Sequence, residues 1–167
     1  KVVVLDTGYN YNHPELASSY SGGFDFVNND NDPFDDNGHG SHVAGIITAD
    51  GADSQARGVA PGAEIIAGKI LDAQGKGFWS NMIEAIYWAV NGPDGNFGTT
   101  DDFRADAINI SMGGGLYSFI CDNVDETTKL LAKAIQYAKD SGVLTIVAAG
   151  NNSSGVSVPG CIDAAFT

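Results

Sequence analysis

Two residues of the sequence have side chains and surroundings suited to proton transfer. Asp6 follows the apolar run 1–5, and His39 lies between Gly38 and Gly40. A carboxylate can orient an imidazole and stabilise its protonated form. The imidazole can take a proton from a hydroxyl nucleophile and return it to a leaving group. Asp6 and His39 are therefore candidates for an acid–base pair; the alternatives are a turn at Asp6 and a structural or helix-capping role for His39.

Apolar runs and amphipathic segments alternate along the sequence and would position these side chains. We expect strands at residues 1–5, 63–71, 105–111 and 143–149, and helices at residues 39–49, 81–90 and 126–141. This alternation predicts an α/β fold in three layers, with a mostly parallel sheet flanked by helices. Sites in such sheets gather at the carboxyl ends of strands, and Asp6, Ser111 and Asn151 all fall just after strand-like runs.

Length and charge restrict the classes of partner. The 167 residues are enough for one domain, and 21 acidic against 8 basic residues give a formal charge of −13. So acidic a chain repels nucleic acid and anionic lipid, and both are excluded as expected partners. No apolar run approaches the roughly 18 residues that a membrane span needs, so no span is expected.

Three motifs resemble those of the subtilisin-like serine proteases, the subtilases (peptidase S8). In chain order they are Asp6-Thr7-Gly8, Gly38-His39-Gly40-Ser41-His42-Val43-Ala44-Gly45 and Ala148-Ala149-Gly150-Asn151. The resemblance implies a serine endopeptidase in which Asp6 orients the imidazole of His39 and His39 acts first as general base and then as general acid. The side-chain amide of Asn151 would donate a hydrogen bond to the oxyanion. It also implies peptide or protein substrates, a possible propeptide, and an extracellular, secreted enzyme.

The serine of the family's triad has no counterpart in this sequence, which reaches Thr167 ahead of a segment of the Gly-Thr-Ser-Met-Ala type. We therefore expect residues 1–167 to be a partial catalytic domain, truncated at its C-terminal side and inactive alone. The C-terminal part of the same protease would then be a partner that carries the serine. The alternative is a non-catalytic fragment that binds peptides or serves assembly.

The segment Asp6-Thr7-Gly8 also matches the motif of pepsin-like and retroviral aspartic proteases. Their mechanism needs two carboxylates that share a proton. The sequence has no second Asp-Thr-Gly, and its helical segments do not suit an all-β lobe. This class of protease therefore remains a remote alternative.

The resemblance also implies a set of substrate-binding residues: Leu71, Gly75, Trp79, Ser111, Met112, Gly113 and Gly150. The segment 111–115 would wall the S1 pocket, and residues 74–77 would form the opposite edge strand. An extended peptide between them would be bound mainly by main-chain hydrogen bonds. Leu71 and Trp79 would line the S2 and S4 pockets, with ordinary core packing as the alternative. An S1 wall of the family's kind favours bulky apolar or aromatic side chains.

Residues 25–36 contain five Asp and three Asn just before His39. Hard oxygen ligands at alternate positions suit Ca²⁺, and the segment resembles the calcium loop of thermitase-like subtilases. The expected ligands are Asp25, Asn28, Asp30 and Asp32, with Asn28 binding through a water. The alternative is a solvated acidic loop. A second calcium loop of the family would fall at residues 50–56, where this sequence lacks the asparagine-rich pattern that the family has there.

Two cysteines, Cys121 and Cys161, allow one disulfide or two buried thiols. Because the resembling family is mainly secreted, a disulfide between them is expected.

Overall fold

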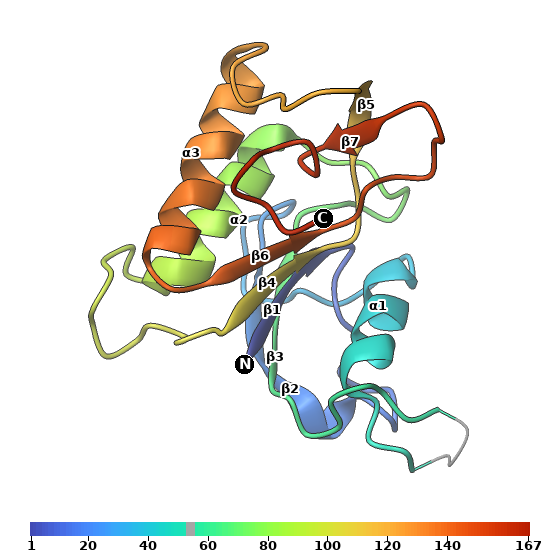
Figure 1. Ribbon diagram of the computed structural model, residues 1–167. Helices are drawn as coiled ribbons and strands as arrows, with labels where there is room; N and C mark the ends of the chain where they lie inside the picture. The colour runs from blue at the N-terminus through green and yellow to red at the C-terminus, as the bar shows by residue number, and fades with distance from the viewer. Residues whose placement is uncertain (53–55) are drawn as a thin grey trace. The chain divides into compact units, whose positions relative to one another are not determined.

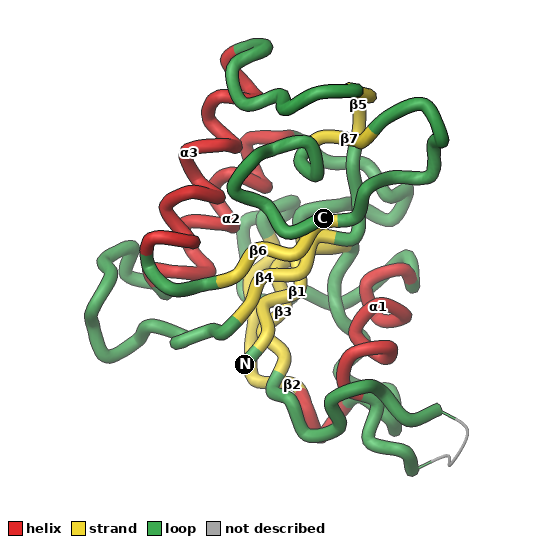
Figure 2. Tube along the Cα trace, in the orientation of Figure 1, coloured by secondary structure: helices red, strands yellow, loops and turns green. Residues whose placement is uncertain are grey.

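Strands and helices alternate along the chain in the computed structural model, which describes residues 1–52 and 56–167. Figures 1 and 2 show parallel strands with helices packed beside them. The chain divides into two compact units, residues 1–85 and 86–167. The boundary falls inside helix α2 (Trp79–Asn91).

The first unit contains three parallel strands in the order β2-β3-β1: β2 (Tyr20–Asp25), β3 (Ile65–Lys69) and β1 (Val2–Asp6). It also holds a 3₁₀ turn, η1 (Ala17–Ser19), and helix α1 (His39–Thr48). The core of the unit is a cluster of buried apolar side chains: Val4, Tyr9, Leu16, Ala44, Ile65 and Ala67. The register pairs Asp6 with Lys69, so the carboxyl ends of β1 and β3 lie together.

The second unit contains the parallel strands β4 (Ala107–Ile110) and β6 (Leu144–Val147), and the antiparallel ribbon of β5 (Gly114–Tyr117) and β7 (Val156–Val158). Helix α3 (Glu126–Asp140) lies beside the C-terminal turns of α2 (Figure 1), where the hydroxyl of Tyr137 donates to Asn91 Oδ1 at 2.6 Å. Buried Leu131, Ala134, Ile135 and Ala138 recur at helical spacing along α3, so this face supplies the unit's apolar contacts.

The predicted α/β fold with mostly parallel strands is confirmed. The four strands and three helices expected from the sequence all form, with ends shifted by a few residues. Strands β2, β5 and β7 were not predicted. Glycine occupies two positions of β2 and two of β5, and β7 has three residues, so these segments lack the apolar runs that identify a strand. Among the described residues, no helix is long and apolar enough to cross a membrane.

Candidate active site

Asp6 and His39 meet at the end of β1. Asp6 is the last residue of the strand and is fully buried, while His39 is the first residue of α1 and its side chain is 49% exposed. Oδ1 of Asp6 lies 2.7 Å from Nδ1 of His39. A carboxylate acceptor at Nδ1 favours the tautomer that carries its proton there, which leaves Nε2 able to accept a proton. The pair is therefore arranged as an oriented general base.

The remaining contacts of Asp6 are few. The backbone N–H of Thr7 donates to Oδ1 at 2.7 Å, and Oδ2 is buried with no hydrogen-bond partner among the described residues. Burial raises the pKa of the Asp6 carboxyl, and it outweighs the hydrogen bonds from His39 and Thr7 that lower it. The partner of Asp6 is an imidazole and not a second carboxylate, so the contacts give no support to the aspartic-protease alternative.

Glycines on both sides of His39 allow this approach. Gly38 caps α1 with a φ of 106°, in the left-handed region that glycine tolerates best. A Cβ on Gly40 would overlap the carbonyl oxygen of Gly8 and would lie 3.2 Å from the Cβ of Asp6. The backbone N–H of Gly40 instead donates to Oγ1 of Thr7 at 2.9 Å. The start of α1 can therefore lie directly against the end of β1.

Asp35 holds the segment that leads into His39, and the sequence analysis did not single it out. Its buried carboxylate accepts five hydrogen bonds, from Thr7 Oγ1, Asn37 N, Gly38 N, Ser41 N and Ser41 Oγ. Burial raises the pKa of Asp35, but these donors outweigh it and hold the pKa at about 2. The signal that could have identified Asp35 is its place four residues before His39, where a carboxylate can accept the free N–H groups at a helix start.

Lys69 was also missed. It ends β3, and its side chain is 2% exposed. Its Nζ donates to the carbonyl oxygens of Thr7 at 2.6 Å and Leu71 at 3.0 Å, and to Oδ1 of Asp36 at 2.7 Å. A lysine inside an otherwise apolar strand is the sequence signal for such a site, because a buried ammonium group needs nearby acceptors.

The predicted substrate-binding residues of the first unit lie beyond β3. The backbone N–H of Leu71 donates to the carbonyl oxygen of Asp6 at 3.2 Å, so this residue is held next to the pair. Gly75 lies at the tip of an exposed turn with a φ of 70°, and Trp79 is the first residue of α2. Residues 74–77 were expected to be an edge strand. Instead, the carboxylate of Asp72 accepts hydrogen bonds from the backbone N–H groups of Gln74 and Lys76, and these bonds close a turn.

The predicted substrate-binding residues of the second unit follow β4 and β6. Ser111 comes directly after β4, and Oγ of Ser111 accepts from Asn109 Nδ2 at 2.9 Å. Beyond β6, Ala148 N donates to the carbonyl oxygen of Ile110 at 3.0 Å, which keeps the two chain segments adjacent. Met112 and Gly113 continue from the first segment, and Gly150 and Asn151 continue from the second. Asn151 is exposed, so its amide is accessible to a ligand.

The acidic segment does not gather its carboxylates around a common point. Among the described residues, no group of three or more His, Cys, Asp or Glu side chains is placed to hold a metal. The Oδ1 of Asp25 accepts from the backbone of Val27 and Asn28, and its Oδ2 accepts from Asn28 Nδ2 at 2.8 Å. Oδ1 of Asp32 accepts from the Tyr11 hydroxyl at 2.7 Å. These hydrogen bonds brace the loop, and the calcium ligands expected from the sequence stay a prediction.

The second calcium loop suggested by the resemblance lies partly outside the described residues, at 53–55. In the described part of this loop, the backbone N–H of Gly51 donates a hydrogen bond to Oε2 of Glu15 at 2.9 Å. The buried carboxylate of Glu15 thus contacts the protein's own main chain.

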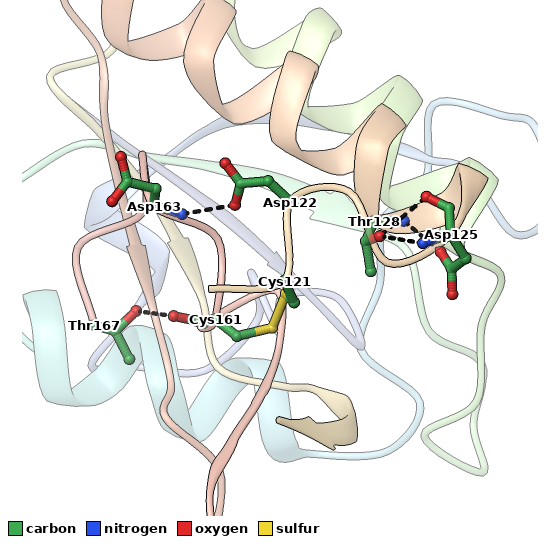
Figure 3. The surroundings of a disulfide bond; sticks show 8 residues. Cys121, Asp122, Asp125, Thr128, Cys161, Asp163 and Thr167 are labelled. Carbon is green, nitrogen blue, oxygen red and sulfur yellow. Dashed lines mark hydrogen bonds between the residues drawn. A yellow bond between two sulfur atoms is a disulfide. The ribbon is translucent and has the colours of Figure 1, made fainter. Parts of the chain in front are cut away.

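A disulfide joins Cys121 and Cys161, whose Cα atoms are 5.4 Å apart (Figure 3). The backbone N–H of Cys121 also donates to the carbonyl oxygen of Cys161 at 2.9 Å. Near the bond, Asp122 Oδ1 accepts from the backbone N–H of Asp163 at 3.0 Å. The bond links the connection before α3 to the segment after β7.

Comparisons with known proteins identify the family and the fold of the chain. The profile of the subtilase family (peptidase S8) matches residues 1–167. The chain is 38% identical to a thermophilic serine proteinase of Bacillus sp. (strain AK1), over 92% of this chain and 33% of that protein. It is 36% identical to thermitase of Thermoactinomyces vulgaris, over 90% of this chain and 47% of that protein.

A solved structure described as S41 psychrophilic protease superposes with a TM-score of 0.75 at 35% identity, covering 95% of this chain and 49% of that one. The chain thus spans a third to a half of the length of these similar proteins. The family match extends over every residue of the chain, and these relatives are identical to it at more than a third of the aligned residues. The chain therefore belongs to the subtilase family.

Proposed function

We propose that the protein carrying these residues is a serine endopeptidase of the subtilisin type, which hydrolyses peptide bonds through an acyl-enzyme. The observation that carries the proposal is the 2.7 Å contact between buried Asp6 Oδ1 and His39 Nδ1, which orients the imidazole as a base. The family membership supports the same chemistry. Asp6 holds the imidazole of His39 in the correct orientation and stabilises its protonated form. His39 transfers the proton.

Each half of the reaction uses these residues in the same way. Nε2 of His39 removes the proton of a serine hydroxyl as that oxygen attacks the scissile carbonyl carbon, and then gives the proton to the leaving amine. In the second half it activates a water, which attacks the acyl-enzyme and releases the serine. The side-chain amide of Asn151 donates to the oxyanion that forms in both halves.

The serine of this mechanism is proposed to lie outside the 167 residues. In the part of the chain that the structure describes, no serine hydroxyl is a hydrogen-bond partner of His39. The catalytic serine would belong to the remaining part of the same protease, so residues 1–167 alone would be inactive toward peptides. A non-catalytic fragment that binds peptides remains the opposing outcome of the test below.

Peptides and proteins are the proposed substrates, and a propeptide is a further proposed partner. The substrate-binding set is Leu71, Gly75, Trp79, Ser111, Met112, Gly113 and Gly150. The support is their place after strand ends: Ser111 follows β4, and Gly150 follows β6. An extended peptide there can form main-chain hydrogen bonds, which tolerate many side chains.

Calcium binding by Asp25, Asn28, Asp30 and Asp32 is a separate proposal. It is supported by the oxygen-rich side chains and their spacing, and opposed by the hydrogen bonds that occupy Asp25 and Asp32. Calorimetric titration of the chelator-treated intact protease with CaCl₂ tests it, with Asp30→Asn as the variant. A binding event that is lost in the variant supports the site, and no heat of binding in the parent protein rejects it.

An extracellular location is proposed from the disulfide, since such bonds persist in oxidising compartments. The names of curated relatives include both an extracellular and an intracellular protease, so family membership alone does not assign the compartment. Mass spectrometry of thiol-blocked protein from culture medium and from cells tests the proposal. Oxidised Cys121 and Cys161 in secreted material support it.

The proposed chemistry is tested by labelling the intact gene product with a serine-directed fluorophosphonate. We expect a serine outside residues 1–167 to gain the phosphonate mass, and His39→Ala to abolish labelling. His42→Ala changes the exposed histidine one helical turn later and serves as the matched control. A protein that binds peptides but never labels would support the non-catalytic alternative.

A further inference from the structure

Thr7 connects the two segments that carry Asp6 and His39. The backbone N–H of Thr7 donates to Oδ1 of Asp6 at 2.7 Å, and the same oxygen contacts the imidazole of His39. The hydroxyl of Thr7 accepts from the backbone N–H of Gly40 at 2.9 Å, and it donates to Oδ1 of Asp35 at 2.8 Å. The hydroxyl thus joins the two residues that directly follow the acid–base pair.

The hydroxyl lies where bulk water cannot replace it. Thr7 is 1% exposed, and Gly40 is buried as well. The backbone N–H groups of Gly38 and Ser41, on either side, donate to the carboxylate of Asp35. Because that carboxylate also accepts from the Thr7 hydroxyl, Thr7 and Asp35 together hold the start of α1 in one hydrogen-bonded arrangement.

The contact between Asp6 and His39 depends on how the start of α1 lies against the end of β1. The side chain of His39 is 49% exposed, so burial around the ring does not set its position alone. The backbone on both sides of the contact must therefore be held in place. A displacement of about 1 Å at a reacting group can cost about 10²-fold in rate, so a bond that fixes this backbone affects the chemistry.

We propose that Thr7 is a positioning residue for proton transfer, whose hydroxyl holds the start of α1 against the end of β1. The inference rests on the proposed function, in which His39 transfers the proton. Thr7 acts through Asp6 and His39 and not on the substrate itself. Its own backbone is anchored, because its carbonyl oxygen accepts from the buried ammonium group of Lys69 at 2.6 Å.

Three substitutions of Thr7 separate the hydroxyl from the shape of the side chain. Thr7→Val replaces the hydroxyl by a methyl group, and Thr7→Ala removes it with a smaller side chain if valine does not fit beside the Asp35 carboxylate. Thr7→Ser keeps the hydroxyl. Thr48→Val is the matched control, because Thr48 is also buried and its hydroxyl donates to the carbonyl oxygen of Ala63 at 2.7 Å, outside the acid–base pair.

The test measures kcat and KM of the intact protease on one peptide p-nitroanilide. Active sites are counted by fluorophosphonate labelling that is run to completion, so unfolded protein does not enter the comparison. Thr7→Val and Thr7→Ala should lower kcat per active site by roughly 10- to 100-fold with little change in KM, because the hydroxyl positions the proton transfer and not the peptide. Thr7→Ser and Thr48→Val should stay close to the parent.

Three results overturn the proposal while leaving the proposed function in place. The first is an unchanged kcat per active site in Thr7→Val or Thr7→Ala. The second is an equal loss in Thr48→Val, which would assign the effect to general loss of stability. The third is an equal loss in Thr7→Ser, which would assign it to side-chain shape. A parent protein that neither labels nor cleaves the peptide overturns the proposed function, and this inference with it.

Discussion

The ammonium nitrogen of Lys69 lies 2.7 Å from Oδ1 of Asp36, and the two side chains differ sharply in exposure. Lys69 is 2% exposed, and the Asp36 side chain is 50% exposed. Lys69 also donates to the carbonyl oxygen of Thr7, the residue after Asp6. Through these contacts the end of β1 is tied to the acidic segment that precedes His39.

Lys69→Met should destabilise the protein by about 1–3 kcal/mol, because it leaves buried carbonyl oxygens without a donor. The loss should not reach the larger values of fully buried ion pairs, since half-exposed Asp36 can regain water. Urea denaturation at pH 7 measures the change. Lys1→Met is the control, because Lys1 and Glu64 form an exposed ion pair that contributes little to stability. Equal losses in the two variants would contradict the prediction.

Asp35→Asn should remove stability at neutral pH and flatten the acid side of the stability curve. The folded-state pKa of Asp35 is about 2, below the ordinary value of 3.8 for an aspartate, so its contribution is present above pH 4 and is lost as the pH falls toward 2. That difference corresponds to about 2 kcal/mol. Asp6 acts in the opposite direction, because its folded-state pKa is raised and its stabilising contribution is lost as the pH rises.

The check on Asp35 is a set of urea denaturation curves between pH 2 and 7 for the parent, Asp35→Asn and the exposed control Asp140→Asn. The stability difference between the parent and Asp35→Asn should shrink as the pH falls. A difference that stays constant across the range would show that Asp35 acts through packing and not through its charge.

Asn151→Ala in the intact protease should lower kcat by about 10²–10³ with little change in KM, a magnitude measured on subtilisin itself. The reason is that the amide would meet negative charge only in the tetrahedral intermediate. Asn152→Ala is the control, because Asn152 is the neighbouring exposed asparagine and its Oδ1 accepts from Ser154 N. Equal kinetic losses in the two variants would argue for a general disturbance of the loop.

Replacing both cysteines by serine should cost about 4 kcal/mol, because the bond closes a loop with a sequence separation of 40. The measurement compares denaturation of the parent protein with that of the Cys121→Ser/Cys161→Ser variant, each with and without reductant. Reductant should lower the stability of the parent and leave the variant unchanged. A parent protein insensitive to reductant under conditions that cleave the bond would refute the prediction.

Much of the framework could be predicted from the sequence, because it depends on local patterns. Buried parallel strands need continuous apolar runs such as Val2–Leu5, and an amphipathic helix such as α3 repeats its apolar residues at three- and four-residue spacing. The resemblance to the family also indicated Asp6 and His39 as a pair and a disulfide between Cys121 and Cys161. Glycine-rich β2 and the short β5–β7 ribbon carry no such pattern.

The sequence by itself thus determined the alternation of strands and helices, the family motifs, and which side chains have the chemistry of proton transfer. Only the tertiary structure decided that Asp35 accepts five hydrogen bonds, that Lys69 binds Asp36, and that the Thr7 hydroxyl binds both Asp35 and Gly40. These contacts join residues that are distant in the chain or separated by turns. Their geometry is set by strand register and close packing, which no local pattern of residue types encodes.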